Sequence, residues 1–241
     1  MIRTTAAIAA ATIASASLAG TTLFNFEGLQ HGEIVDSQFS PSLTISGINN
    51  AKSFDLVASF DTNLTGTADD DLEGPPWSGG NLAIDADNVD LGNVLILSTN
   101  DDGAGDGILD DPNDEGARPA GSITFTFSSA IGLFGFDLVD IEGVILEASM
   151  LEFSLNGQSV GSVSLTDFVD TNSSFYDSSV VFGNNYANRF SPITAADLGS
   201  VFDEVTLNLG GSGAIDNILI PAPGALALVG LGGLVATRRR R

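Results

Sequence analysis

Hydrophobic and polar positions alternate in short runs along the chain, and clusters of glycine, asparagine, aspartate and serine separate these runs. The alternation is clearest at 123–127, where Ile123, Phe125 and Phe127 fall on one face and two threonines on the other. A period of two residues is typical of a strand with one buried face. The pattern therefore predicts an all-β protein of about eleven short strands. The predicted strands are 23–27, 43–48, 54–60, 94–98, 123–128, 133–141, 151–155, 159–165, 179–182, 204–209 and 214–220.

Turn residues and aromatic residues indicate how the predicted strands are arranged. Asn156 and Gly157 separate two alternating runs, and both central positions of a type I′ turn need a positive φ, so residues 151–165 should form a hairpin. Thr194 is placed to cap one helical turn that ends at Leu198. The 15 phenylalanines suit a core between two sheets. We expect residues 20–220 to form an antiparallel β-sandwich of jelly-roll type.

The first 19 residues have the layout of a secretory signal peptide. Arg3 supplies the positive charge, residues 6–14 are apolar, and Ser17, Leu18 and Ala19 form a small-x-small cleavage site. We expect cleavage after Ala19 and export of the rest of the chain.

Residues 221–241 carry a second pattern, in three parts. Two prolines precede an uncharged apolar stretch at 224–236, and the chain ends in an arginine cluster; the residues are Pro221, Pro223, Arg238, Arg239, Arg240 and Arg241. Arginines at the end of an apolar transmembrane helix stay on the cytoplasmic side, so we expect the body outside the membrane. The stretch is at or below the roughly 20 residues that cross a hydrocarbon core, and its glycines weaken a helix. A processed tail fits this composition better than a permanent anchor.

This three-part tail resembles the PEP-CTERM sorting domain of exopolysaccharide-producing Gram-negative bacteria, with Pro-Ala-Pro where the family typically has Pro-Glu-Pro. The resemblance implies that an exosortase-type transpeptidase processes the chain and that the chain is held in the membrane only transiently. It also implies delivery to the cell surface or the extracellular matrix, where exopolysaccharide is a candidate partner.

Charge narrows the functions that the body can have. Residues 20–220 hold 31 acidic residues against Lys52, Arg118 and Arg189. This balance excludes a nucleic-acid binder, which needs a basic stripe. With no cysteine, the exported domain must be held by its core or by metal ions. Two explanations of the acidity stay open, a diffuse halophilic surface and discrete Ca²⁺ sites.

The first candidate Ca²⁺ site is the acidic, glycine-rich segment 100–115. Closely spaced oxygen ligands and flexible glycines suit Ca²⁺, which accepts 6 to 8 oxygens. Within the segment, residues 106–114 resemble the Asp-rich calcium loops of thrombospondin type 3 repeats, and the alternative is a solvated acidic loop. The candidate ligands are Asp101, Asp102, Asp106, Asp110, Asp111, Asn113, Asp114 and Glu115.

A second candidate joins the two ends of the body. The segments around Glu27 and Asp216 resemble the terminal strands of galactose-binding-like and carbohydrate-binding jelly rolls. The resemblance implies a structural Ca²⁺ between these two carboxylates. The alternative is two ordinary acidic residues at strand ends.

A third acidic cluster, Asp69, Asp70, Asp71 and Glu73, is typical of a solvated loop. The loop continues to Trp77, the only tryptophan, which could stack on a sugar ring or plug one end of the sandwich.

Support for an enzyme is thin. His31 is the only histidine, cysteine is absent, and no Gly-x-Ser-x-Gly motif occurs. We therefore expect an exported, non-enzymatic, Ca²⁺-stabilised protein with a structural or adhesive role. The alternatives are a carbohydrate-binding module that uses Trp77 with Tyr176 or Tyr186, and a glycoside-active hydrolase with two carboxylates in a cleft.

Overall fold

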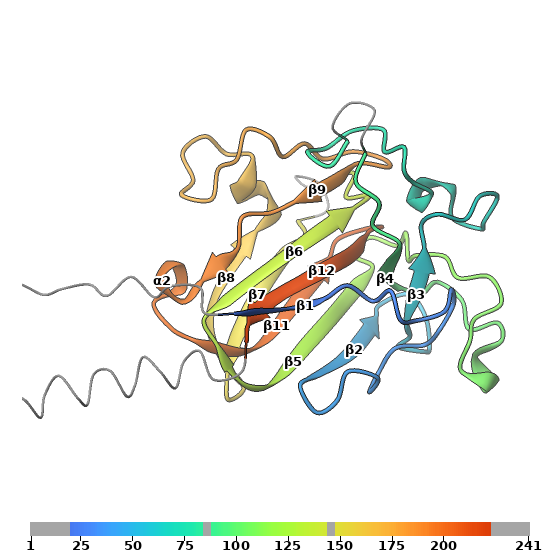
Figure 1. Cartoon of the computed structure of the whole chain (residues 1–241), viewed down its shortest axis with the longest axis horizontal. Helices are drawn as coiled ribbons and strands as arrows, with labels where there is room; N and C mark the ends of the chain where they lie inside the picture. Colours follow the sequence, from blue (N-terminus) through green and yellow to red (C-terminus); the bar gives the residue numbers. More distant parts are fainter. Residues whose placement is uncertain (1–19, 84–87, 144–147, 223–241) are drawn as a thin grey trace, which may run out of the picture. The chain divides into compact units, whose positions relative to one another are not determined.

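The computed structural model describes residues 20–83, 88–143 and 148–222. Strands form two antiparallel sheets, so the predicted all-β class is confirmed (Figure 1). Residues Thr22–Ile220 make one compact unit. The predicted signal peptide at 1–19 lies outside the described residues, and so does most of the predicted sorting segment, residues 223–241. Within the described part of the chain, no helix is long and apolar enough to cross a membrane.

The larger sheet has the order β10-β6-β12-β4-β3, with β1 beside β12 and β9 beside β6. Strand β4, which lies between β12 and β3, is buried along its whole length, whereas a strand in a sheet with one solvent-exposed face alternates in burial. Both faces of this sheet are therefore covered. Its strands are β1 (Thr21–Phe24), β3 (Val57–Asp61), β4 (Asn93–Leu97), β6 (Leu133–Val139), β9 (Ala187–Arg189), β10 (Ile193–Thr194) and β12 (Ala214–Pro221).

The second sheet has the order β2-β5-β11-β7-β8. Its strands alternate in burial as the sequence predicts: in β5, Ile123, Phe125 and Phe127 are buried, and Thr126 is exposed. The β7–β8 hairpin turns at Asn156 and Gly157, whose φ values of 52° and 72° fit the predicted type I′ turn. The strands are β2 (Leu43–Asn49), β5 (Gly121–Ile131), β7 (Met150–Leu155), β8 (Gln158–Ser164) and β11 (Phe202–Leu209).

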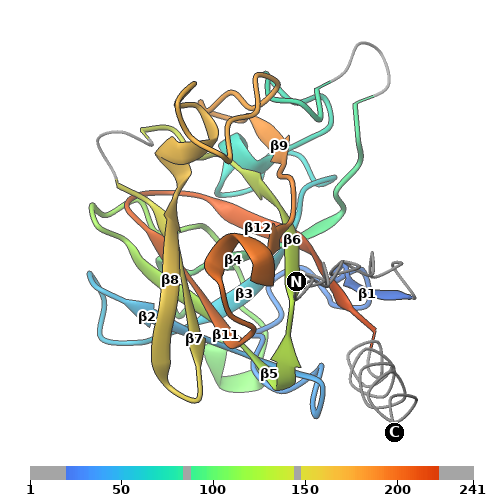
Figure 2. The same cartoon turned by 90° about the vertical axis from the view of Figure 1, so that its left-hand side faces the viewer.

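The main hydrophobic core lies between the two sheets, which Figure 2 shows from the side. The ring of Phe134 in the first sheet is 6.0 Å from Phe125 and 6.4 Å from Phe153 in the second sheet, measured between ring centroids. A separate hydrophobic cluster, which includes Phe60, Leu72 and Trp77, covers the other face of the first sheet. Loops therefore pack over that face, and both candidate sites described below lie among them.

Short helical turns complete the fold: η1 (Asp70–Leu72), η2 (Ala104–Asp106), η3 (Leu165–Phe168) and α2 (Ala195–Leu198). The predicted turn after Thr194 is confirmed, because the Thr194 N–H and hydroxyl both donate to Asp197 Oδ2, at 2.8 and 2.7 Å. The predicted strand at 179–182 is wrong. That segment is an irregular loop, although it packs Phe182 against Phe190.

Candidate functional site

Three segments that are far apart in the sequence bring carboxylates to one cavity of about 520 Å³. The loop at η1 supplies Asp69, Asp70 and Asp71, the segment after β4 supplies Asp114 and Glu115, and the chain after β6 supplies Glu142. The other lining residues are Ala68, Thr99, Asn113, Gly116, Arg118 and Ser212. The third acidic cluster is therefore no simple solvated loop, since Asp69 is only 6% exposed.

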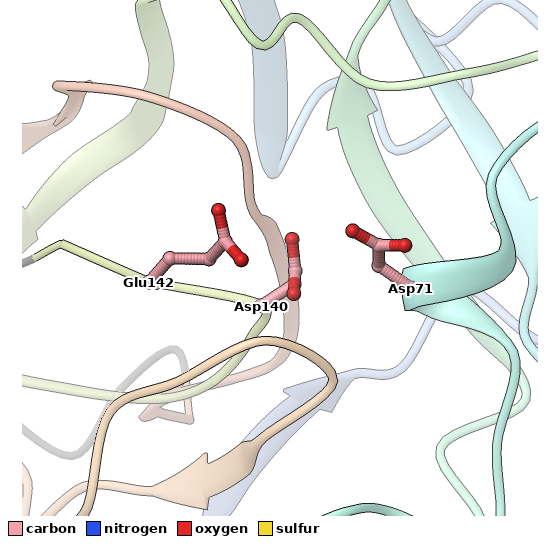
Figure 3. Close-up of side chains that lie close together, drawn as sticks. All are labelled: Asp71, Asp140 and Glu142. Carbon is pink, nitrogen blue, oxygen red and sulfur yellow. The ribbon is translucent and has the colours of Figure 1, made fainter.

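Asp71, Asp140 and Glu142 converge most closely. One carboxylate oxygen from each lies within 4.8 Å of the others, and Figure 3 shows the three carboxyl groups directed toward one another. Asp140 is 1% exposed, whereas Asp71 and Glu142 line the cavity. The group therefore combines a fully buried carboxyl with two accessible ones.

Backbone donors hold the buried member in place. Asp140 has a φ of 60°, and its Oδ1 accepts from the Asn185 N–H at 2.7 Å. The Asn185 side chain donates to the carbonyl oxygens of Asp71 and Glu73, both at 2.9 Å. One asparagine thus ties the η1 loop to the end of β6.

Two more buried carboxyl groups in the cavity are also held by N–H donors. Asp69 Oδ2 accepts from the Asp114 N–H at 2.9 Å, and Asp114 Oδ2 accepts from the Gly213 N–H at 2.5 Å. Burial raises the pKa of Asp69 to about 6 and that of Asp140 to about 7, against the lowering effect of these hydrogen bonds. Burial and the Asp69 charge raise the pKa of Asp114 well above its usual range.

A cluster of carboxyl groups of this kind can retain protons or bind a hard divalent cation. Burial raises the pKa of Asp71 as well, and the neighbouring Asp70 adds to the effect. The basic residue of the lining is Arg118, whose Nη2 lies 3.5 Å from Glu142 Oε2. One arginine cannot neutralise a cavity with this many carboxyl groups.

Asp216, on β12, is buried in a different way. It is 1% exposed, and neither carboxylate oxygen has a hydrogen-bond partner. Burial raises its pKa to about 9, and the charges of Asp137 and Glu27 add to the effect. The Asn217 N–H lies close enough to lower this pKa, but its geometry falls short of a hydrogen bond.

Asp137, on β6, is the direct cross-strand partner of Asp216 and is equally buried. Its two oxygens accept from Arg189 Nε at 2.9 Å and Arg189 Nη2 at 2.7 Å, and Asn217 Nδ2 adds a third bond at 2.8 Å. The nearby arginine is therefore engaged with Asp137. Asp216 receives no comparable compensation.

Glu27 is close enough to Asp216 for its charge to raise the pKa of Asp216, and it packs against Gly92 and Asn93. Glu27 Oε1 accepts from the Asn93 N–H at 3.2 Å, and Asn93 Nδ2 donates to the Leu29 carbonyl at 3.1 Å. The buried Asn93 Oδ1 has no partner. A Cβ at position 92 would lie 2.3 Å from both Glu27 oxygens, so only glycine permits this approach. Burial raises the pKa of Glu27, with contributions from Asp90 and Asp61.

The Asp-rich segment 100–115 divides into two parts. Asp101, Asp102, Asp106, Asp110 and Asp111 are exposed. Local hydrogen bonds shape this loop. The Ile108 N–H donates to Asp106 Oδ1 at 3.1 Å, and the Asp110 N–H donates to the Asp102 carbonyl at 2.9 Å.

The last residues of that segment turn inward. Asp114 joins the acidic cavity, and Asn113 donates its side-chain amide to the Ala68 carbonyl. Glu115 is 5% exposed, and its Oε2 accepts from Asn49 Nδ2 at 3.2 Å. Calcium binding by the exposed part stays a prediction.

The structure gives Trp77 a structural position. The ring is 5% exposed, and its Nε1–H donates to the Val89 carbonyl at 2.8 Å. A sugar-stacking role for Trp77 therefore lacks the open ring face that it requires. His31 is also packed, because its ring lies 5.1 Å from Phe60 and its Nδ1 accepts from the Asp61 N–H at 3.1 Å.

Sequence reasoning missed Asp140, Glu142 and Asn185. A signal for the first exists, since Asp140 comes directly after the buried β6 strand and would be costly there without a partner. Nothing local pairs it with Asn185, which lies 45 residues away.

No protein-family model and no curated protein sequence matches the chain. Among solved structures, the chain is similar to the K2 cleaved adhesin domain of Lys-gingipain, with 10% identity and a TM-score of 0.37 over 83% of this chain and 99% of that one. It is also similar to the K1 cleaved adhesin domain of Lys-gingipain from Porphyromonas gingivalis W83, with 10% identity and a TM-score of 0.26 over 76% of this chain and 99% of that one. Similarity at this level carries no argument about function.

Proposed function

We propose that this chain is an exported, non-enzymatic β-sandwich protein that binds Ca²⁺ between Glu27 and Asp216 and has a structural or adhesive role. The observation that carries the proposal is the Asp216 carboxylate, which is buried with both oxygens unpartnered. Buried polar groups are nearly always paired, so an unpaired carboxylate indicates a partner such as an ion.

The chemistry around Asp216 favours Ca²⁺. Carboxylate oxygens from Asp216 and Glu27 and the free Asn93 Oδ1 are hard donors of the kind that Ca²⁺ prefers. The remaining acidic neighbours, Asp61 and Asp90, add negative potential at Glu27. A divalent cation would favour the charged form of Asp216 and remove its repulsion with Asp137.

The sequence ends support the proposed location. The signal-peptide layout at 1–19 supports export, and the three-part tail at 221–241 supports processing by an exosortase-type enzyme after transient membrane insertion. The destination would be the cell surface or the extracellular matrix, with exopolysaccharide as a candidate partner. We assign the sandwich to the jelly-roll type because the chain crosses repeatedly between the sheets, at β1–β2, β2–β3, β4–β5, β5–β6, β6–β7, β8–β9, β10–β11 and β11–β12.

Thermal melting of the full chain with Ca²⁺, with Mg²⁺ and with chelator tests the proposal. We expect Ca²⁺ to raise the Tm and chelator to reverse the effect, because an ion that binds only the folded state stabilises it. Asp216→Asn should abolish the response, and Asp101→Asn, in the exposed acidic loop, should keep it. A Tm that ignores Ca²⁺ would overturn the proposed ion site.

The acidic cavity favours one second candidate, a glycoside-active hydrolase. Such enzymes need two carboxyl groups on either side of a bound sugar, and this cavity offers several, with raised pKa values for Asp69, Asp71 and Asp114. Release of reducing sugar from a panel of polysaccharides, lost in Asp69→Asn or Asp71→Asn, would support this candidate. No release by the wild-type chain would leave the non-enzymatic proposal in place.

A further inference from the structure

The same five-residue pattern, Asp-Thr-Asn-x-Thr/Ser, occurs twice in this chain, at 61–65 and at 170–174. Each copy contains Asn-x-Ser/Thr, the acceptor sequence for N-linked glycans in exported proteins. A glycan can be attached only where the asparagine is exposed and its surroundings are open. Both copies meet this condition, although they lie in unrelated parts of the fold.

The first copy begins at the last residue of β3. Asn63 and the following residues through Gly66 are exposed, and a Cβ on Gly66 would meet nothing within 4 Å. Asp61 Oδ1 accepts from the Asn63 backbone N–H at 3.0 Å and fixes the turn. The exposed Asn63 side chain donates from its Nδ2 to Asp90 Oδ1 at 2.9 Å.

The second copy follows η3. Thr171, Asn172 and Ser174 are exposed. Asp170 Oδ1 accepts from the Asn172 backbone N–H at 2.9 Å, which repeats the geometry of the first copy. Asn172 Nδ2 also donates to Asp170 Oδ1, at 2.9 Å. In both copies the carboxamide is thus oriented by an exposed hydrogen bond, which is cheap to exchange.

We propose that Asn63 and Asn172 are N-glycosylation sites. The inference rests on the proposed export of the chain, which brings it to an extracytoplasmic transferase. The chemical class of the donor is a glycan that is activated at its anomeric carbon by a pyrophosphate, carried on a lipid.

The transfer balances without an oxidant or reductant. The Asn Nδ2 forms a bond to the anomeric carbon, the bond from that carbon to the pyrophosphate oxygen breaks, and the lipid pyrophosphate leaves with its electron pair. One Nδ2 proton passes to a base of the transferase. The hydroxyl of Thr65 or Ser174, two residues after each asparagine, is the group that the transferase must recognise.

The full chain, with its own signal sequence, should be produced in bacterial cells that hold an N-oligosaccharyltransferase and a lipid-linked glycan. Mass spectrometry of the two peptides should find glycan on Asn63 and on Asn172. Thr65→Ala should remove it from Asn63 alone, and Ser174→Ala from Asn172 alone. Thr171→Ala is the matched control, since it removes an exposed hydroxyl next to Asn172 but keeps the acceptor sequence, and it should keep the glycan.

Two outcomes overturn the inference: neither asparagine carries glycan in a chain whose signal peptide has been removed, or the glycan on Asn63 survives Thr65→Ala. An intact signal peptide would instead count against export. In that case the purified full chain is incubated with the transferase and the lipid-linked glycan. Transfer to Asn63 and Asn172, with none to the exposed Asn184, then supports the inference, and no transfer to either overturns it.

Discussion

The acidic cavity and the Asp216 site bury carboxyl groups in opposite ways. Asp69 and Asp114 in the cavity, and Asp140 behind it, each accept a hydrogen bond from a backbone N–H. At the second site, Asp216 on β12 accepts no hydrogen bond, although its side chain is at least as buried. The same residue type therefore accepts a backbone hydrogen bond in one place and none in the other.

This difference distinguishes buried carboxyl groups that have a structural role from one that indicates a bound ligand. A buried carboxyl that the protein itself satisfies can stay protonated or hydrogen-bonded and needs nothing further. A buried carboxyl with no donor costs stability until something else supplies the compensation. Asp137 sharpens the contrast, because it pairs with Asp216 on the neighbouring strand and accepts three hydrogen bonds, two of them from Arg189.

Removal of Ca²⁺ should have the largest effect. At a free concentration about 100 times its Kd, an ion that binds only the folded state adds about 2.7 kcal/mol to the free energy of unfolding. For a domain of this size that corresponds to a Tm change of about 5 to 10 °C. Calorimetry in Ca²⁺ and in chelator measures the shift. Equal Tm values in both buffers would mean that Asp216 needs no bound ion, like the carboxyl groups of the acidic cavity.

Removal of a carboxyl group that accepts a hydrogen bond should lower the free energy of unfolding by somewhat less. Asp140→Ala leaves the buried Asn185 N–H without its acceptor, and we expect a loss of about 2 kcal/mol in urea unfolding. Asp140→Asn keeps an acceptor oxygen and tolerates the positive φ, so its loss should be smaller. In chelator, Asp216→Ala should cost less than Asp140→Ala, because no hydrogen bond disappears. The reverse order would contradict the comparison.

Within one pH unit, the effect of pH in chelator should come next in size. The pKa of Asp216 is about 9 in the folded chain, above its unfolded value of about 3.9, so the folded state holds an extra proton between these values. Stability from this group is full below about pH 4 and falls as the pH rises toward 9, by about 1.4 kcal/mol per pH unit for one proton.

Urea unfolding of wild type and Asp216→Asn in chelator, at several pH values in that range, isolates this group. The variant should lose less stability as the pH rises, since it cannot titrate. Parallel curves would mean that Asp216 is charged in the metal-free chain.

The exposed acidic loop should show the smallest effect. Asp101→Asn changes a solvated side chain, and we expect the free energy of unfolding to change by less than about 0.5 kcal/mol. The Ca²⁺ response of the Tm should also be unchanged. If this substitution removes the response while Asp216→Asn keeps it, the ion binds at the loop that the sequence singled out.

Local patterns predicted the strands well. Alternation at 123–127 and the Asn156–Gly157 turn depend on neighbouring residues only, and both are seen in the structure. The short strands β9 and β10 were missed because Asn and Pro surround them and neither is long enough to show a period. The run at 179–182 was mistaken for a strand, because two of its apolar residues, Val180 and Phe182, pack against the core from a loop.

The acidic cavity could not be predicted, because its carboxyl groups come from three segments that only the tertiary fold joins. The cluster at Asp69–Asp71 looks like a solvated loop until Asp114 and Asp140 are placed beside it. The closeness of Glu27 to Asp216 was anticipated from a resemblance to known jelly rolls. The residues alone gave no reason for that pairing, and the free Asn93 oxygen was not foreseen at all.

A calorimetric titration of Ca²⁺ into the full chain and into Asp216→Asn tests the central claim most directly. We expect saturable binding to the wild type and the loss of that site in Asp216→Asn, whereas Asp69→Asn, in the cavity, should still bind. Binding that is the same in wild type and Asp216→Asn would contradict it.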